Sequence, residues 1–166
     1  MKIAIVSDSH DNLPNIYKAL GYIKKQGIDT IVHCGDVCAP KVLEEFAKNF
    51  SGKIYLVYGN VDGDHEGFKR VARENPRLTL FEDSGEINFG NLVFALTHYP
   101  EQAEDLARSG SYDVVFYGHT HIPWEKKVGK ATLLNPGTLA GLFQKATFAI
   151  FDADTKTAQL VLLEKI

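Results

Sequence analysis

The amino-acid sequence predicts one α/β domain, a four-layer αββα sandwich in which two mixed β-sheets pack together and helices flank them. Short apolar runs alternate with stretches of helical period in the first third of the chain. Many short strand-like runs, separated by turn residues, make up most of the remainder. No linker, repeat or low-complexity tract divides residues 1–166, so both halves are expected to share one core in a single domain.

Strands and helices alternate in the first third. The apolar run at residues 3–6 predicts a buried strand, and Pro14 suits the first turn of the helix that follows. Residues 30–33 and 54–58 predict two more strands, with an amphipathic helix around residues 42–46 between them. Such alternation favours parallel strands with right-handed crossovers, so the loops that leave these strands should gather at one sheet edge.

The second part of the sequence is richer in strands. Helices are expected around residues 68–73 and from about 101 to 108. Turn pairs such as Gly90-Asn91 and Gly129-Lys130 indicate hairpins between neighbouring strands. Strands are expected at residues 79–81, 86–89, 92–96, 114–117, 126–128, 132–134, 147–151 and 159–163.

Composition and charge narrow the class of protein. A chain that is 45% hydrophobic and 23% charged is typical of a domain with a substantial core. The net charge of −3 offers no general attraction to polyanions, so stable nucleic-acid binding is not expected. No apolar stretch is long enough to span a membrane. Cys34 and Cys38 form no disulfide framework, and a reducing cytoplasm is the expected location.

Five polar clusters each follow a predicted strand, and we expect them to converge on one site. Carboxylate, imidazole and amide oxygen are ligands that suit divalent Zn, Mn, Fe, Co or Ni. Asp8 and His10 stand two residues apart, so both can meet one ion only if the chain turns on leaving its strand. The clusters are Asp8-Ser9-His10, Gly35-Asp36, Gly59-Asn60-Val61-Asp62, Thr97-His98 and Gly118-His119-Thr120-His121.

Each cluster also has a structural interpretation, because a lone Asp or His after a strand commonly caps a helix or bonds to backbone. Four histidines and two aspartates at matching strand ends exceed what capping requires, which favours a metal site. His33 lies inside a predicted strand and is expected to be a buried hydrogen-bonding residue. His65 is expected at the surface, with a role as substitute proton donor as the alternative.

The order of these clusters closely resembles the calcineurin-like metallophosphoesterase superfamily, and within it the small bacterial and archaeal phosphodiesterases. The resemblance covers the whole chain, including Asn135-Pro136-Gly137, which looks like the family's closing loop. It implies a metallo-dependent phosphatase-like fold and seven ligands to two divalent metal ions. The first ion would take Asp8, His10 and His121, the second would take Asn60, His98 and His119, and Asp36 would bridge both.

The resemblance also implies a reaction, the hydrolysis of a small phosphate ester by in-line attack of a metal-bridging hydroxide. Asp36, Asn60, Asp62 and His98 would serve in catalysis. Mn²⁺ or Ni²⁺ are the favoured cofactors, with Fe, Co or Zn left open.

The sequence departs from the commoner family pattern at two places. Many members have a histidine after Gly-Asn that donates a proton to the leaving group, and Val61 stands there instead. Without this histidine, the hydrolysis rate of an ester with a poor leaving group should be lower by roughly 10²–10⁴-fold. Diesters with good leaving groups are therefore favoured. Asp62 is then left to hold a ligand or the loop. Tyr99-Pro100 follows His98, and we expect Pro100 to open a helix and Tyr99 to pack on it rather than line the substrate mouth.

Other functions stay open at this point. A phosphomonoesterase or protein phosphatase is disfavoured by Val61. A protein-binding scaffold, like the retromer subunit of this fold with its impaired metal site, is disfavoured because all seven ligand positions are intact. The natural ester, the native metal and a homo-oligomeric state are left open by the sequence.

Overall fold

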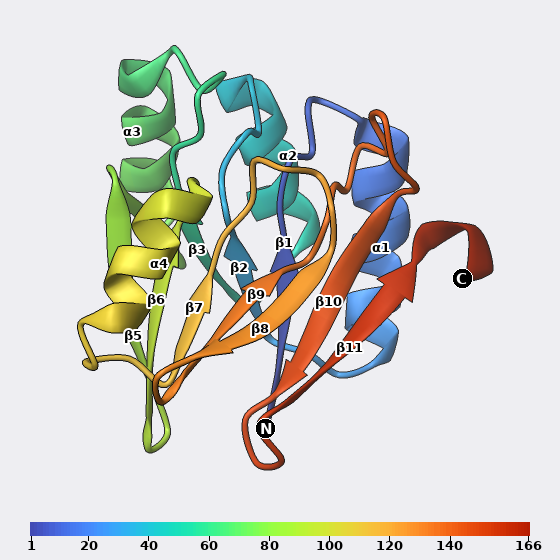
Figure 1. The fold of residues 1–166 in the computed structure, drawn as a ribbon. Coiled ribbons are helices and arrows are strands. Elements are labelled where there is room, and N and C mark those ends of the chain that lie inside the picture. The colour runs from blue at the N-terminus through green and yellow to red at the C-terminus, as the bar shows by residue number, and fades with distance from the viewer.

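Two stacked β-sheets lie at the centre of the structure, a computed structural model that describes residues 1–166 (Figure 1). The first sheet has six strands and the second has five, and both are mixed. In spatial order the first contains β11 (Thr157–Leu162), β10 (Thr147–Asp152), β1 (Lys2–Val6), β2 (Thr30–His33), β3 (Lys53–Val57) and β4 (Leu78–Phe81). The second contains β5 (Ser84–Phe89), β6 (Leu92–Thr97), β7 (Val114–Phe116), β9 (Ala131–Asn135) and β8 (Trp124–Val128).

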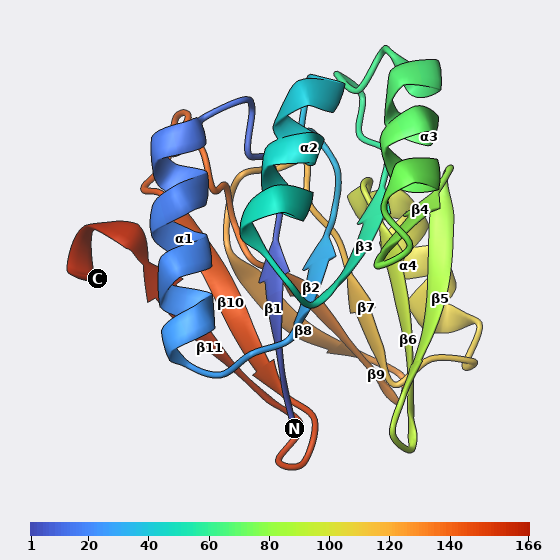
Figure 2. The same ribbon diagram turned by 180° about the vertical axis from the view of Figure 1, so that it is seen from behind.

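Four α-helices cover the outer faces of these sheets. The helices α1 (Leu13–Lys25), α2 (Pro40–Asn49) and α3 (His65–Glu74) lie on the first sheet, as Figure 2 shows. Helix α4 (Pro100–Arg108) packs on the second sheet. The layers run helix, sheet, sheet, helix, which confirms the predicted αββα sandwich. None of the helices combines the length and apolar character needed to cross a bilayer.

Alternation of side chains along the strands produces this layering. In β1, Ala4 and Val6 belong to the cluster under the helices, whereas Ile3 and Ile5 belong to the cluster between the sheets. Val115 of β7 faces outward into the cluster beneath α4. The three apolar clusters contain 24, 14 and 7 buried residues, so the largest part of the core lies between α1–α3 and the first sheet.

Proline and capping residues explain where the helices begin. Pro14, Pro40 and Pro100 lie in the first turns of α1, α2 and α4, where a missing N–H costs no intrahelical hydrogen bond. Asn12 and Asp64 cap α1 and α3 by accepting hydrogen bonds from backbone N–H groups of the first turn. Each helix therefore begins close behind one of the polar clusters, and its start anchors the loop that carries them.

All predicted strands and helices form, and the differences lie at their ends. Helix α3 begins at His65, ahead of the expected residues 68–73, because Asp64 caps it. Tyr58 lies beyond the end of β3, where the chain leaves the sheet. The short 3₁₀ helix η1 (Leu163–Lys165) was not predicted, since three residues carry too little periodicity to signal a helix.

The loops that follow β1, β2, β3, β6 and β7 meet at one end of the two sheets, the upper edge in Figure 1. Backbone hydrogen bonds join them there: the Asp8 N–H donates to the Gly35 carbonyl at 3.0 Å, and the Gly118 N–H donates to the His98 carbonyl at 3.1 Å. The first three loops come from one sheet and the last two from the other. Hydrogen bonds thus join loops within each sheet, and contact between the sheets brings the two sets of loops together.

A substitution at Phe148, in β10, tests how much the largest apolar cluster stabilises the fold. The Phe148 side chain is fully buried and its ring packs edge-on against Tyr22. Phe148→Ala should lower the free energy of unfolding by about 3–5 kcal/mol, because it removes apolar contacts and leaves a cavity; urea denaturation measures this. Phe143→Ala is the matched control, since the Phe143 side chain is 95% exposed, and it should change stability by under about 0.5 kcal/mol. Equal losses would contradict this description of the core.

Candidate metal centre

The seven predicted ligands lie together at the upper edge of the sheets, in two adjoining groups. The ligand atoms of Asp8, His10, Asp36 and His121 all lie within 4.8 Å of one another. The other group contains Asn60, His98 and His119. The Asn60 Oδ1 atom lies 3.0 Å from both His98 Nε2 and His119 Nδ1.

The Asp36 carboxylate lies between these two groups and is almost fully buried. Its Oδ2 atom is 3.7 Å from His10 Nε2, and its Oδ1 atom is 3.5 Å from His98 Nε2. The Val61 N–H also donates to Oδ1 at 3.1 Å, which holds the plane of the carboxylate. Asp36 thus presents one oxygen to each group.

Hydrogen bonds on the far side of two imidazole rings fix which nitrogen faces the site. His98 Nδ1 donates to the Cys34 carbonyl at 2.7 Å, and His121 Nδ1 donates to the Leu142 carbonyl at 3.1 Å. In the neutral rings the Nε2 atoms therefore carry lone pairs. His121 Nε2 lies 3.3 Å from Asp8 Oδ1, close enough for one cation to contact both atoms.

Burial of these acceptors calls for a positive charge. Asp8 is fully buried, and its Oδ1 atom has no hydrogen-bond partner. Loss of solvation raises the pKa of Asp8 to about 7 and lowers the pKa of His10 and His98, so these two imidazoles stay neutral. A buried carboxylate facing neutral rings is costly unless a cation compensates it. The residues therefore fit a divalent metal ion.

Five of the seven predicted ligands have a left-handed backbone that residues other than glycine rarely adopt. This conformation turns the chain between near neighbours, so that Asp8 and His10 both face the site, as do His119 and His121. The predicted turn after each strand is thereby confirmed. The φ values are 52° for Asp8, 39° for His10, 59° for Asp36, 68° for His119 and 61° for His121.

The three glycines in the clusters serve two purposes. Gly35 has a φ of +94°, which glycine adopts without strain. Gly59 and Gly118 instead permit close approach: an added Cβ would lie 2.1 Å from Asp36 Oδ1 and 2.0 Å from Ser7 Oγ, respectively.

Asp62 holds the loops rather than facing the open site. It is 1% exposed, and its oxygens accept hydrogen bonds from the backbone N–H groups of Asp36 at 2.9 Å, Cys38 at 2.7 Å and Gly59 at 2.7 Å. Burial raises the pKa of Asp62, and these hydrogen bonds oppose that rise. Its carboxylate therefore ties the loop after β2 to the loop after β3.

The Asn135-Pro136-Gly137 loop supports the site from the second sheet. The Asn135 side-chain amide donates to the Gly118 carbonyl at 2.8 Å and to Thr120 Oγ1 at 3.1 Å. Close by, the Thr138 hydroxyl donates to the Asp8 carbonyl at 2.9 Å. This segment thus joins the loop after β1 to the loop after β7.

His33 is buried and hydrogen-bonded, as predicted. The Gly35 N–H donates to His33 Nδ1 at 3.2 Å, so His33 Nε2 carries the proton and donates to Ser9 Oγ at 3.0 Å. Ser9 stands between Asp8 and His10, so this contact joins two ligand loops. Sequence reasoning missed the part played by Ser9, because nothing in its local pattern names its partner.

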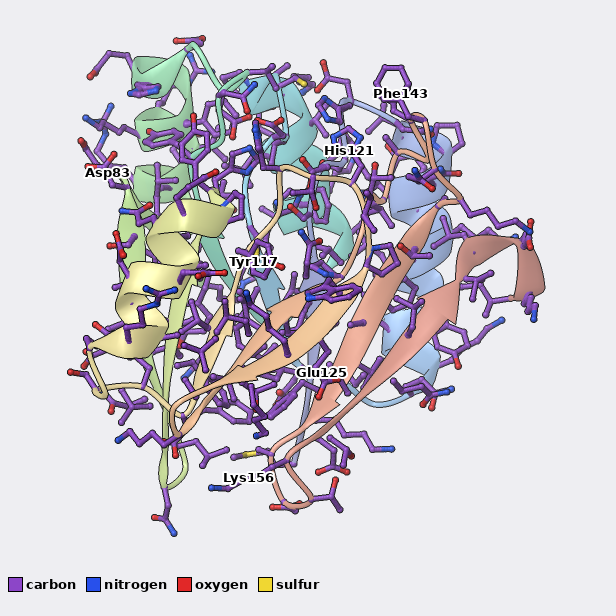
Figure 3. The ribbon with its side chains drawn as sticks, in the orientation of Figure 1. Asp83, Tyr117, His121, Glu125, Phe143 and Lys156 are labelled. Carbon is purple, nitrogen blue, oxygen red and sulfur yellow. The ribbon has the colours of Figure 1, made fainter.

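Aromatic rings surround the open side of the site. Pro100 begins α4 as predicted, but the Tyr99 ring lies edge-on against His98 at 5.0 Å and His119 at 5.1 Å. The expected packing of Tyr99 on the helix alone is therefore incomplete. Figure 3 labels His121 and Phe143 close together at the upper edge. Their ring centroids are 6.2 Å apart, and the sequence analysis did not single out Phe143.

Comparisons with known proteins agree with this geometry. A family model described as the calcineurin-like phosphoesterase superfamily domain matches residues 1–156. Phosphodiesterase MJ0936 of Methanocaldococcus jannaschii is 36% identical over 167 residues, which cover 99% of this chain and 100% of that protein. Phosphodiesterase YfcE of Escherichia coli K12 is 26% identical over 162 residues, with 84% of this chain and 80% of that protein covered.

Solved structures are similar over nearly the full length. An archaeal phosphodiesterase has a TM-score of 0.90 at 34% identity, covering 98% of this chain and 99% of its own. Vps29 of Entamoeba histolytica, solved with zinc, has a TM-score of 0.70 at 16% identity, covering 98% and 99%, and shares the fold alone. On its fold, its family match and its relatives, the chain belongs to the calcineurin-like phosphoesterase superfamily.

Proposed function

We propose that this protein is a metal-dependent phosphodiesterase that hydrolyses a small phosphate diester, with residues 1–166 acting as one domain. The observation that carries the proposal is Asp36, whose two oxygens face different ligand groups at 3.7 and 3.5 Å. Relatives that match across the chain are named phosphodiesterases. The complete ligand set favours catalysis over a purely protein-binding role.

The proposed ligand assignment follows the two groups. Asp8, His10 and His121 hold one divalent ion, Asn60, His98 and His119 hold the other, and Asp36 contacts both. Mn²⁺ or Ni²⁺ suit this mixture of carboxylate, imidazole and amide ligands, with Fe, Co and Zn as alternatives. When bound, the ions draw charge from the phosphoryl oxygens and make water acidic enough to attack phosphorus. The unpaired cysteines Cys34 and Cys38 fit the cytoplasmic location that we also propose.

The side chains at the site position the substrate and the metal ligands, and none of them is assigned as a proton donor to the leaving group. Asn60 and His119 lie at the exposed side of the site, where a phosphate would enter, and Asp36 and His98 form its buried floor. Asp62 acts as a positioning residue through the three backbone N–H groups that it binds. Val61 is 40% exposed at the mouth and has no proton to donate, so a leaving group that is stable as an anion is favoured.

Loss of a ligand tests the metal site. Asp36→Asn and His119→Ala should each lower turnover of bis-p-nitrophenyl phosphate in Mn²⁺ by more than about 100-fold, beyond the effect of removing an outer hydrogen-bond partner. Chelation should abolish turnover of the wild type, and added Mn²⁺ should restore it. Circular dichroism checks the fold, and Asp105→Asn, at an exposed position on α4, serves as control. Wild-type rates in both ligand variants would overturn the assignment.

Gly59 tests the close packing around Asp36. A Cβ at this position would lie 2.1 Å from Asp36 Oδ1 and 2.4 Å from Asp36 N, so Gly59→Ala must displace the carboxylate. A displacement near 1 Å lowers rates by about 100-fold, and kcat/KM for the diester should fall accordingly. Gly63→Ala is the control, because its Cβ would meet nothing within 4 Å. Similar kcat/KM values in both variants would count against a fixed position for Asp36.

Val61 tests the proposed preference for diesters. Val61→His introduces a proton donor at a 40% exposed position and should raise activity on alkyl esters or monoesters, relative to bis-p-nitrophenyl phosphate, by about tenfold or more. Val61→Gln adds polarity without a titratable proton and should leave that ratio near the wild-type value. An unchanged ratio in Val61→His would mean that the position has no part in leaving-group departure.

A further inference from the structure

A cavity of about 430 Å³ adjoins the group formed by Asn60, His98 and His119. Its walls come from the end of β3, the start of α3, the turn between β4 and β5, and the start of α4. Gly59 and Tyr99 both line it, and they are the chain neighbours of Asn60 and His98. The cavity therefore lies next to two of the predicted ligands.

Three aromatic residues line the cavity, of which Tyr99 and His65 are exposed and Tyr58 is buried. The Tyr99 side chain is 41% exposed, and its ring meets the His98 and His119 rings edge-on at 5.0 and 5.1 Å. Tyr58 and His65 stack with their centroids 4.0 Å apart and their planes at 6°. An organic group entering the cavity thus meets π-systems.

The remaining walls are acidic. Glu82 is paired with Lys69 at 2.9 Å, but Asp83 and Glu101 are exposed and form no ion pair or side-chain hydrogen bond. Figure 3 labels Asp83 at the side of the molecule near α3 and α4. None of the eight residues that line the cavity is Lys or Arg. A second phosphate or a carboxylate on the substrate would be repelled here, whereas a cation would be attracted.

We propose that this cavity binds one organic arm of the diester and selects an arm that carries an ammonium group. The inference rests on the phosphodiesterase function proposed above and names its substrate class, a phosphodiester of an amino alcohol. Aromatic faces combined with carboxylates are the chemistry that recognises quaternary and primary ammonium ions. The same walls disfavour polynucleotides, whose neighbouring phosphates would enter an acidic cavity.

Two diesters with the same p-nitrophenyl leaving group test the proposal. One carries a choline arm, and the other carries the uncharged isostere 3,3-dimethylbutyl, so the ratio of their kcat/KM values reports recognition of charge at constant shape. Mn²⁺-loaded wild-type protein should favour the choline ester by roughly 5- to 30-fold at low salt. The preference should shrink as ionic strength rises. A wild-type ratio near one would overturn the proposal.

Variants locate the effect within the cavity. The double variant Asp83→Asn/Glu101→Gln removes two charges with little change in volume and should bring the ratio toward one. Its matched control, Glu74→Gln/Asp105→Asn, removes the same charge at exposed positions that do not line the cavity and should keep the wild-type ratio. Equal losses in the two double variants, or a wild-type ratio in the first, would overturn the assignment.

A failure of the proposed phosphodiesterase function can be distinguished from a failure of the proposed selectivity. If the protein turned over neither these esters nor bis-p-nitrophenyl phosphate with Mn²⁺ or Ni²⁺, the phosphodiesterase assignment would fail. The two esters would then survive incubation and serve as ligands in calorimetry. Tighter binding of the choline ester, lost in Asp83→Asn/Glu101→Gln, would support the cavity's selectivity, and equal Kd values would overturn it.

Discussion

The buried carboxylate of Asp36 is the feature on which the rest of the site depends. It lies between nitrogen atoms of two groups, with His10 Nε2 3.7 Å from one oxygen and His98 Nε2 3.5 Å from the other. An uncompensated buried anion costs several kcal/mol, and neutral imidazoles supply no opposite charge. A bound divalent metal ion would resolve this conflict. The same requirement explains the unpaired Oδ1 atom of Asp8, so one electrostatic demand accounts for both carboxylates.

Holding these groups together strains the chain, and the fold offsets that strain. Five predicted ligands adopt left-handed backbone conformations, which together cost about 5–15 kcal/mol at the usual 1–3 kcal/mol each. That sum equals the whole net stability of a typical domain. Buried hydrogen bonds oppose it: Asp62 accepts from the backbone of the ligand loops, and Asn135 and His33 donate to them. Apolar clusters on both faces of the first sheet oppose it too. The site therefore requires a rigid support, which explains its place at the ends of central strands.

The residues at the open side of the site determine which esters the protein can hydrolyse. Val61 at the mouth offers no proton, so chemistry depends on a leaving group that departs as an anion. Tyr99 lies beside two of the histidines, and the cavity that it lines has two carboxylates, Asp83 and Glu101, without basic partners. These features act on different parts of a diester: the first on the bond that breaks, the second on an organic arm. Reactivity and selectivity are thus separate properties of neighbouring surfaces.

The sequence by itself determined the strands, the helices and the polar clusters that follow the strands, and the family resemblance added the predicted ligand set. Hydrophobic periodicity and proline placement act locally, and a polar cluster after a strand is visible in the chain. Only the tertiary structure decided that Asp62 binds three backbone N–H groups and that Tyr99 lies against His98 and His119. The first outcome depends on how two loops of the first sheet meet, and the second on how two loops of the second sheet meet. Partners far apart in the chain leave no local pattern, because their contact is set by the packing of the sheets.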